Sequence, residues 1–181
     1  MKNLLRFSTA VLFSISLTAC GDGKQEDSAA TTTESTTANT DNSTQQGKGS
    51  VTLVCNGQTF VTAGNCNYSS PASAIVIADS ADNRNAVTLN IEGGLPGASK
   101  TYKLVDVVSG TENLSMSFTR FPDKAMNDWE TKDGAGTLAM SVEGNKITCT
   151  FSNIPMVGSE IYNADGLKGA ATCSGSFTLY K

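Results

Sequence analysis

The stretch VTLVCNGQTFV, residues 51–61, decides the fold class of this chain. Two short runs of β-prone residues flank the dipeptide Asn56-Gly57. Asn-Gly is the strongest short signal for a β-hairpin, because both central positions of the tight turn need a positive φ. The stretch therefore predicts two antiparallel strands joined by a two-residue turn.

The same alternation of apolar and polar residues recurs along the rest of the chain. No window has apolar residues at the i, i+3, i+4 and i+7 spacing of an amphipathic helix, whereas period two is frequent. Further strands are predicted at 73–78, 86–91, 101–108, 114–121, 135–142, 146–151 and 169–180. Short strands separated by turn residues indicate an all-β fold, a single antiparallel β-sandwich or small barrel of about 8–10 strands. The predicted domain comprises residues 51–181.

The first 19 residues have the pattern of a secretory signal peptide. Lys2 and Arg6 are followed by a mostly apolar run at 7–17, which is shorter than the roughly 20 apolar residues of a transmembrane helix. The tetrapeptide Leu17-Thr18-Ala19-Cys20 resembles the lipobox of bacterial lipoproteins. The resemblance implies cleavage before Cys20, acylation of Cys20 with palmitate-like chains, and anchoring in a membrane through those chains. The alternative is an ordinary signal peptide with a chance cysteine.

Residues 20–50 are expected to be a disordered tether between this anchor and the domain. After Cys20 the segment lacks Val, Leu, Ile and aromatic residues and is rich in Thr, Ser, Asn and Gln. Such a composition cannot bury enough apolar surface to offset its chain entropy. By resemblance to enterobacterial lipoproteins, in which Asp after the cysteine retains the protein at the inner membrane, Gly21 favours the outer membrane. The sequence leaves the periplasmic or surface face open.

Composition excludes several classes of function. The chain contains no His, which excludes Ser-His-Asp and Cys-His catalysis and every His-ligated zinc or copper site. Its 13 Lys and Arg and 17 Asp and Glu give a net charge of −4, and they are scattered along the chain. Because no basic face is visible, nucleic acid is not an expected partner, and no cofactor is predicted.

The cysteines and one acidic loop are candidate covalent or metal sites. The predicted domain holds four of the five cysteines of the chain. An even number of cysteines in an exported domain indicates two disulfides, and four cysteines allow three pairings. The pairings local in sequence, Cys55–Cys66 and Cys149–Cys173, are favoured. A four-cysteine zinc site is the alternative, although the chain has no C-x-x-C pair. Residues 79–85 gather Asp and Asn side chains, which suit calcium but are also common turn formers.

Five strand-like segments carry a family resemblance: 51–60, 100–104, 134–138, 146–151 and 173–177. They are similar to a family of uncharacterised β-rich domains of bacterial cell-envelope lipoproteins. The resemblance implies a β-sandwich and a cell-envelope address, and it carries no catalytic residues. Cys149 stands where the family pattern has glycine, so its disulfide is expected to be a local variation.

The segment 121–134 is a candidate binding loop. It holds the only Trp of the chain, Trp129, between Asp128 and Glu130, and it begins at Phe121. Aromatic residues framed by polar groups are typical of contact surfaces, and a Trp that caps one end of the core is the alternative. Asp128 and Glu130 lie about 7 Å apart if they share one face of a strand, and they are also candidate paired carboxylates for glycoside hydrolysis.

These observations predict a non-enzymatic lipoprotein that acts as a binding or structural module in the cell envelope. Its partners are expected to be the membrane, through the lipid anchor, and an envelope protein, glycan or lipid. One alternative is a protein inhibitor of a lysozyme or protease. Another alternative is a hydrolase that uses carboxylates.

Overall fold

The computed structural model describes residues 46–79, 85–122, 125–163 and 166–181, which all lie in the compact unit Asp41–Lys181. These residues form strands and connections and contain no helix, and therefore no helix that could cross a membrane. The predicted all-β class is confirmed. The strands are β1 (Gln46–Cys55), β2 (Gln58–Ser69), β3 (Ala74–Asp79), β4 (Asn85–Ile91), β5 (Lys100–Leu104), β6 (Asn113–Arg120), β7 (Asn127–Glu130), β8 (Thr137–Glu143), β9 (Lys146–Asn163) and β10 (Ala170–Tyr180).

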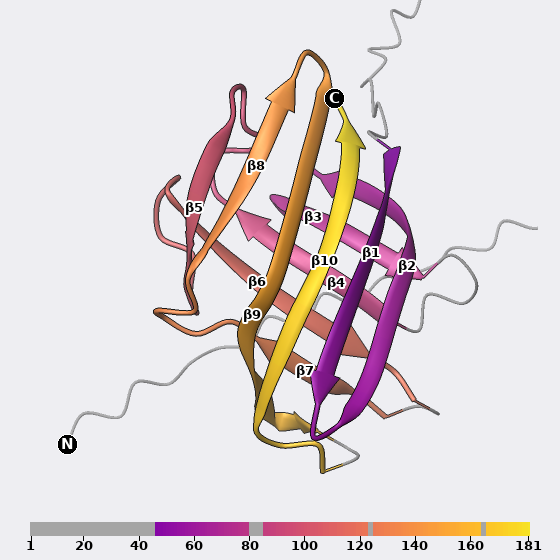
Figure 1. The fold of residues 1–181 in the computed structure, drawn as a ribbon. Helices are drawn as coiled ribbons and strands as arrows, with labels where there is room; N and C mark the ends of the chain where they lie inside the picture. The colour runs from indigo at the N-terminus through magenta and orange to yellow at the C-terminus, as the bar shows by residue number, and fades with distance from the viewer. Residues whose placement is uncertain (1–45, 80–84, 123–124, 164–165) are drawn as a thin grey trace, which may run out of the picture. The chain divides into compact units, whose positions relative to one another are not determined.

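The strands form one large sheet, in the order β10-β1-β2-β3-β4-β6-β5-β8-β9-β7 (Figure 1). All pairings are antiparallel except the short one between β5 and β6. Two additional pairings, β10 with β9 and β6 with β7, connect strands that are distant in this order. The hydrogen-bonded ladder therefore runs from β1 through the sheet to β9 and returns through β10 to β1.

The hairpin that decides the fold class forms as predicted. Asn56 has a φ of 50° and Gly57 a φ of 76°, and Cys55 pairs with Gln58 on either side of them. These values are those of a tight hairpin turn whose two central residues are left-handed. The Asn-Gly signal therefore identified both the turn and its position.

Alternation along the strands builds the core. Val87, Leu89 and Ile91 of β4 are buried, and so are Leu114, Met116 and Phe118 of β6. Their backbone partners match, since Val87 pairs with Phe118 and Leu89 with Met116. Each fully buried side chain of this size contributes about 1.5–3 kcal/mol relative to exposure to water. The inward faces of these strands follow the predicted period of two.

The first strand begins earlier than predicted. Residues 46–50 were expected in the disordered tether, but they pair with β10 on one side and with β2 on the other. That expectation is wrong because composition counts only side chains, whereas this segment is held by its backbone. Gly47 makes the pairing close, since a Cβ there would lie 1.8 Å from the Thr178 carbonyl oxygen. The remainder of the predicted tether and the signal peptide, residues 1–45, lie outside the described residues.

Two segments outside the predicted strands are strands in the structure: one was expected to be a loop and the other had no assignment. β7 lies within the expected 121–134 loop, and β9 continues to Asn163 instead of ending at residue 151. In β9, Phe151 pairs with Gly175 while Ile154 pairs with Cys173, so the register shifts at a bulge. Asn153 has a φ of 53° there. The bulge changes the phase of the alternation, and this hides the continuation of the strand in the sequence.

We expect Gly175→Ala to destabilise the domain by about 1–3 kcal/mol, because overpacking forces backbone and side chains to move. A Cβ at Gly175 would lie 2.5 Å from the Ser50 carbonyl oxygen and 2.9 Å from Val51 Cα. Gly97→Ala is the matched control, since nothing lies within 4 Å of a Cβ at that position. Urea unfolding of both variants measures the difference. Equal stability of the two variants would contradict the close approach of β1 and β10.

Candidate functional site

The four cysteines of the domain are free and buried, so the predicted disulfides are absent. In the β1–β2 hairpin, Cys55 lies beside the turn while Cys66 pairs with Gly47 near the other end. Eight residues of β1 separate these positions, about 26 Å at roughly 3.3 Å per residue. A disulfide needs Cα atoms about 4.4–6.8 Å apart, which excludes the Cys55–Cys66 bond.

The second predicted disulfide is wrong for the same reason. Cys149 pairs with Phe177, which is four residues from Cys173 along β10, a separation of about 13 Å. Both pairings were chosen for closeness in sequence, and the strand register overrides that criterion. Among the described residues no group of three or more Cys, Asp or Glu is suited to a metal ion, so the four-cysteine zinc alternative is also wrong. Of the predicted calcium loop, residues 80–84 lie outside the described residues, and Asn85 donates a hydrogen bond to Asp79 (3.1 Å).

Burial disfavours the thiolate form of three of these cysteines. It raises the pKa of Cys66, Cys149 and Cys173 to about 12. The thiolate is the nucleophile and the metal ligand, and it is scarce at neutral pH when the pKa is raised this far. The cysteines are therefore part of the core and not of a reactive site.

Trp129 belongs to the core. It lies on β7, is fully buried, and packs against Phe118 (ring centroids 6.2 Å apart) and Phe60 (5.7 Å). The core alternative for Trp129 is thus confirmed, and its role as an exposed contact residue is wrong. Phe121 is 43% exposed just beyond the end of β6. The one signal for β7 in the sequence is the alternation of Asn127 and Trp129, which are buried, with Asp128 and Glu130, which are charged and half-buried.

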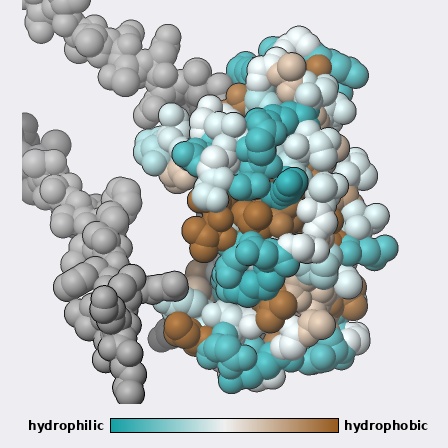
Figure 2. Space-filling model, turned by 90° about the vertical axis from the view of Figure 1, so that its left-hand side faces the viewer, coloured by the Kyte–Doolittle hydropathy of each residue, from teal (hydrophilic) through white to brown (hydrophobic). Residues whose placement is uncertain are grey.

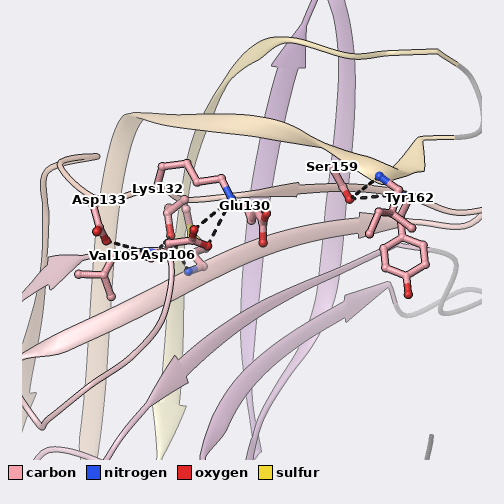
Figure 3. Close-up of polar contacts among 10 residues, drawn as sticks. Val105, Asp106, Glu130, Lys132, Asp133, Ser159 and Tyr162 are labelled. Atoms are coloured by element: carbon pink, nitrogen blue, oxygen red, sulfur yellow. Dashed lines mark hydrogen bonds and ion pairs between the residues drawn. The ribbon is translucent and has the colours of Figure 1, made fainter. Parts of the chain in front are cut away.

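Asp128 and Glu130 share the outward face of β7, as their spacing predicted. Thr119 donates a hydrogen bond to Asp128 Oδ1 (2.7 Å). Lys132 Nζ contacts Glu130 Oε1 (2.6 Å) and Asp106 Oδ1 (3.3 Å), so one ammonium group serves both carboxylates (Figure 3). Among the ion pairs of the described residues, none includes Asp128.

The electrostatic consequence is that Asp128 carries an uncompensated charge. Burial raises the pKa of Asp128 above its usual value, the hydrogen bond from Thr119 opposes that shift, and the charge of Glu130 adds to it. The charge of Glu130, in contrast, is neutralised by the ion pair with Lys132. Two neighbouring carboxylates on one face therefore have different electrostatic partners.

Thr131 fixes the end of β7 beneath this pair. Its hydroxyl accepts a hydrogen bond from the Met116 N–H (3.0 Å) and donates one to the Val105 carbonyl (2.9 Å). Its own N–H donates to the Met116 carbonyl (2.9 Å). The residue is fully buried, so these bonds satisfy polar groups that water does not reach. They hold the backbone that presents Glu130 and Lys132.

An irregular part of β9 lies beside Asp128. Asn127 pairs with Asn163 and Trp129 pairs with Gly158, so four residues of β9 face the single position of Asp128. These four residues, 159–162, lie within β9 and have no partner position in β7, and we call them the 159–162 turn. Ser159 Oγ accepts hydrogen bonds from the N–H groups of Ile161 (3.3 Å) and Tyr162 (3.1 Å), which fixes its backbone (Figure 3).

The 159–162 turn presents apolar side chains to solvent. Ile161 is 82% exposed and Tyr162 is 50% exposed. Glu160 is paired with Lys168 (3.3 Å). Sequence reasoning missed this feature, because nothing in the residue types of 159–162 signals a departure from the ladder. The signal lies in the register with β7, which the sequence does not contain.

The side of the domain that carries β5 and β8 is mixed in character. Figure 2 shows hydrophobic side chains gathered between hydrophilic ones on this face. A different surface is a shallow depression over β1, β9 and β10. Its lining is mixed and has one charged side chain: Lys48, Gly49, Ser50, Thr148, Cys149, Thr150, Ser176, Phe177 and Thr178.

Comparison with known proteins gives no match. No family model fits the chain, and no curated protein or solved structure is significantly similar to it. The resemblance to envelope lipoprotein domains therefore stays an expectation from the sequence.

Thiol chemistry tests the state of the cysteines. In a Cys20→Ser chain, we expect the native protein to be unreactive toward Ellman's reagent and the unfolded, unreduced protein to react with four thiols per chain. A Val61→Cys variant is the control, since Val61 is 50% exposed and its replacement reacts without unfolding. Fewer than four thiols in denaturant would indicate a disulfide and contradict the register.

The charge on Asp128 predicts a pH-dependent effect of Asp128→Asn. At about pH 3 the carboxyl is protonated in both folded and unfolded chains, so the variant and the original have similar stability. As the pH rises through the raised pKa of folded Asp128, ionisation occurs in unfavourable surroundings and the original chain loses stability relative to the variant. The Asn oxygen still accepts from Thr119. Free energies of unfolding at about pH 3 and at neutral pH measure this difference in stability. A stability advantage of the variant that is largest at about pH 3 would contradict the prediction.

Proposed function

We propose that this chain is an exported lipoprotein, anchored through Cys20 in the bacterial outer membrane, whose β-domain acts as a non-enzymatic binding module. The observation that carries the binding role is the distribution of exposed apolar residues between the two ends of the domain. We call the end that contains the Asn56-Gly57 turn the far end. The anchor itself rests on the lipobox resemblance at residues 17–20.

The register places the far end opposite to the start of β1. β1 begins at Gln46 and ends at Cys55, which spans about 30 Å at roughly 3.3 Å per residue. The Cys55 end adjoins Ala171, and Ala171 pairs with Met156 of β9, shortly before the 159–162 turn. In Figure 1 the start of β1 and the C-terminus lie at the top, and β7 and the end of β9 lie at the bottom.

Among the described residues, five of the eight exposed large apolar side chains lie toward this far end: Val54, Phe121, Val157, Ile161 and Tyr162. The other three are Val61 on β2, Val107 after β5, and Tyr180 at the opposite end. Scattered single apolar residues are ordinary on a protein surface, but a gathering at one end indicates an interaction site. A tether that enters at the start of β1 would leave the far end free to meet a partner. The complete circuit of strand pairings supports the small-barrel form of the predicted fold.

An inhibitor of a lysozyme or protease is the second candidate. The 159–162 turn favours it, because its backbone is fixed by Ser159 and its Ile161 and Tyr162 side chains project from the surface. A rigid projecting turn enters a partner cleft with little loss of conformational entropy. Inhibition assays with a lysozyme and a serine protease test it. Ile161→Ser is the control variant, because it removes an exposed side chain of the turn and leaves the buried core unchanged.

Metabolic labelling with palmitate tests the anchor. We expect the label on the original chain and on a Cys55→Ala variant, and its loss in Cys20→Ser, because only the lipobox cysteine would be acylated. The labelled chain is expected in the membrane fraction, and the Cys20→Ser chain in the soluble exported fraction. An unlabelled, soluble original chain would overturn the proposed location.

A further inference from the structure

Asp128 differs from the carboxylates around it because no Lys or Arg of the described residues forms an ion pair with it. Glu130 and Asp106 share the ammonium group of Lys132, and Glu160 is paired with Lys168. Within the described part of the chain, the Asp128 carboxylate has one polar partner, the Thr119 hydroxyl. A half-buried carboxylate that lacks a counter-charge gains more from a cation than an exposed carboxylate does, because the local dielectric is lower.

The most exposed apolar residue among the described residues lies beside this carboxylate. The register between β7 and β9 places the 159–162 turn next to Asp128, and the side chain of Ile161 is 82% exposed there. Tyr162 adds a half-exposed aromatic ring with a polar end. The hydrogen bonds to Ser159 hold both residues in place before any partner arrives.

We propose that Asp128, Ile161 and Tyr162 form a docking surface for a protein partner that brings a Lys or Arg side chain to Asp128 and covers Ile161 and Tyr162 with an apolar pocket. This inference rests on the proposed function and names the class of its partner. Tyr on this chain and Arg on a partner are among the residue types that dominate the binding energy of protein interfaces, and the apolar Ile161 extends the area that a partner would cover. The pre-formed backbone of the turn reduces the entropy lost on docking.

The charge of the surface favours a protein over the other envelope partners. An anionic lipid surface would be repelled by Asp128, and the neighbouring Glu130 and Glu160 are already neutralised by their own lysines. A glycan would contact the ring of Tyr162 but would leave the projecting Ile161 without an apolar pocket. A cationic side chain that is flanked by apolar residues satisfies both features at once.

Site-specific photocrosslinking in the native cells tests the proposal. The photoreactive residue p-benzoylphenylalanine replaces Ile161 in one chain and Tyr180 in the control chain, since Tyr180 is 46% exposed but lies at the opposite end of the domain. We expect a discrete protein adduct from position 161 alone. Adding Asp128→Asn, or raising NaCl to about 0.5 M, is expected to reduce the adduct about tenfold, because both remove the charge attraction.

The crosslinked protein is then identified by mass spectrometry, purified and used as the binding probe. We expect Ile161→Ser to weaken its affinity about tenfold and Val61→Ser, a matched exposed residue on β2, to change it less than about twofold. Replacement of the partner's Lys or Arg near the crosslinked peptide is expected to weaken binding to the original chain. The same replacement is expected to change binding to the Asp128→Asn chain little, because the charge attraction is already absent there.

Several results would overturn the docking surface. These are a lipid or glycan adduct, an adduct that is insensitive to Asp128→Asn, or an adduct from position 180 but not from 161. The last result would leave a binding role in place at another part of the domain. No adduct from either position, together with no palmitate on Cys20, would overturn the proposed function itself.

Discussion

The backbone pairing between β9 and β10 is the constraint on which the rest of the domain depends. The ladder extends from Ala170 opposite Val157 to Tyr180 opposite Lys146, and β10 pairs with β1 on its other side. It therefore connects β10, the first strand of the sheet order, to β9, the ninth. An unpaired strand edge of this length promotes pairing with other chains, and this ladder satisfies the facing edges of β9 and β10. The inward apolar side chains of these strands belong to one hydrophobic core.

The candidate site arises where β9 changes its partner. β9 pairs with β10 up to Val157 and then with the short strand β7 at Gly158 and Asn163. Between those two contacts with β7 the strand has more residues than β7 can pair. The surplus forms the 159–162 turn, and Ser159 supplies the hydrogen bonds that the ladder no longer provides. The mismatch between β7 and β9 therefore places the projecting apolar residues beside Asp128.

The sequence predicted those features that are local and missed those that depend on register. The Asn56-Gly57 turn followed from the sequence directly. The shared face of Asp128 and Glu130 followed from their spacing only on the condition that the segment is a strand, because side-chain direction alternates along a strand. The continuation of β9 was missed because the bulge at Asn153 shifts that alternation. Closeness of cysteines in sequence suggested disulfides, but which strand positions face each other is a tertiary property. The 159–162 turn depends on two long-range pairings, so no local pattern announces it.

The placement of β1 has a mechanical consequence. The strand starts at Gln46 and is hydrogen-bonded along its length to β10 on one side and to β2 on the other. If the chain is tethered before Gln46 and grips something at the far end, tension acts parallel to β1. Hydrogen bonds in antiparallel ladders lie across the strands, so such tension shears both ladders at once instead of breaking their bonds one after another. The domain is then well suited to withstand pulling without unravelling from its first strand.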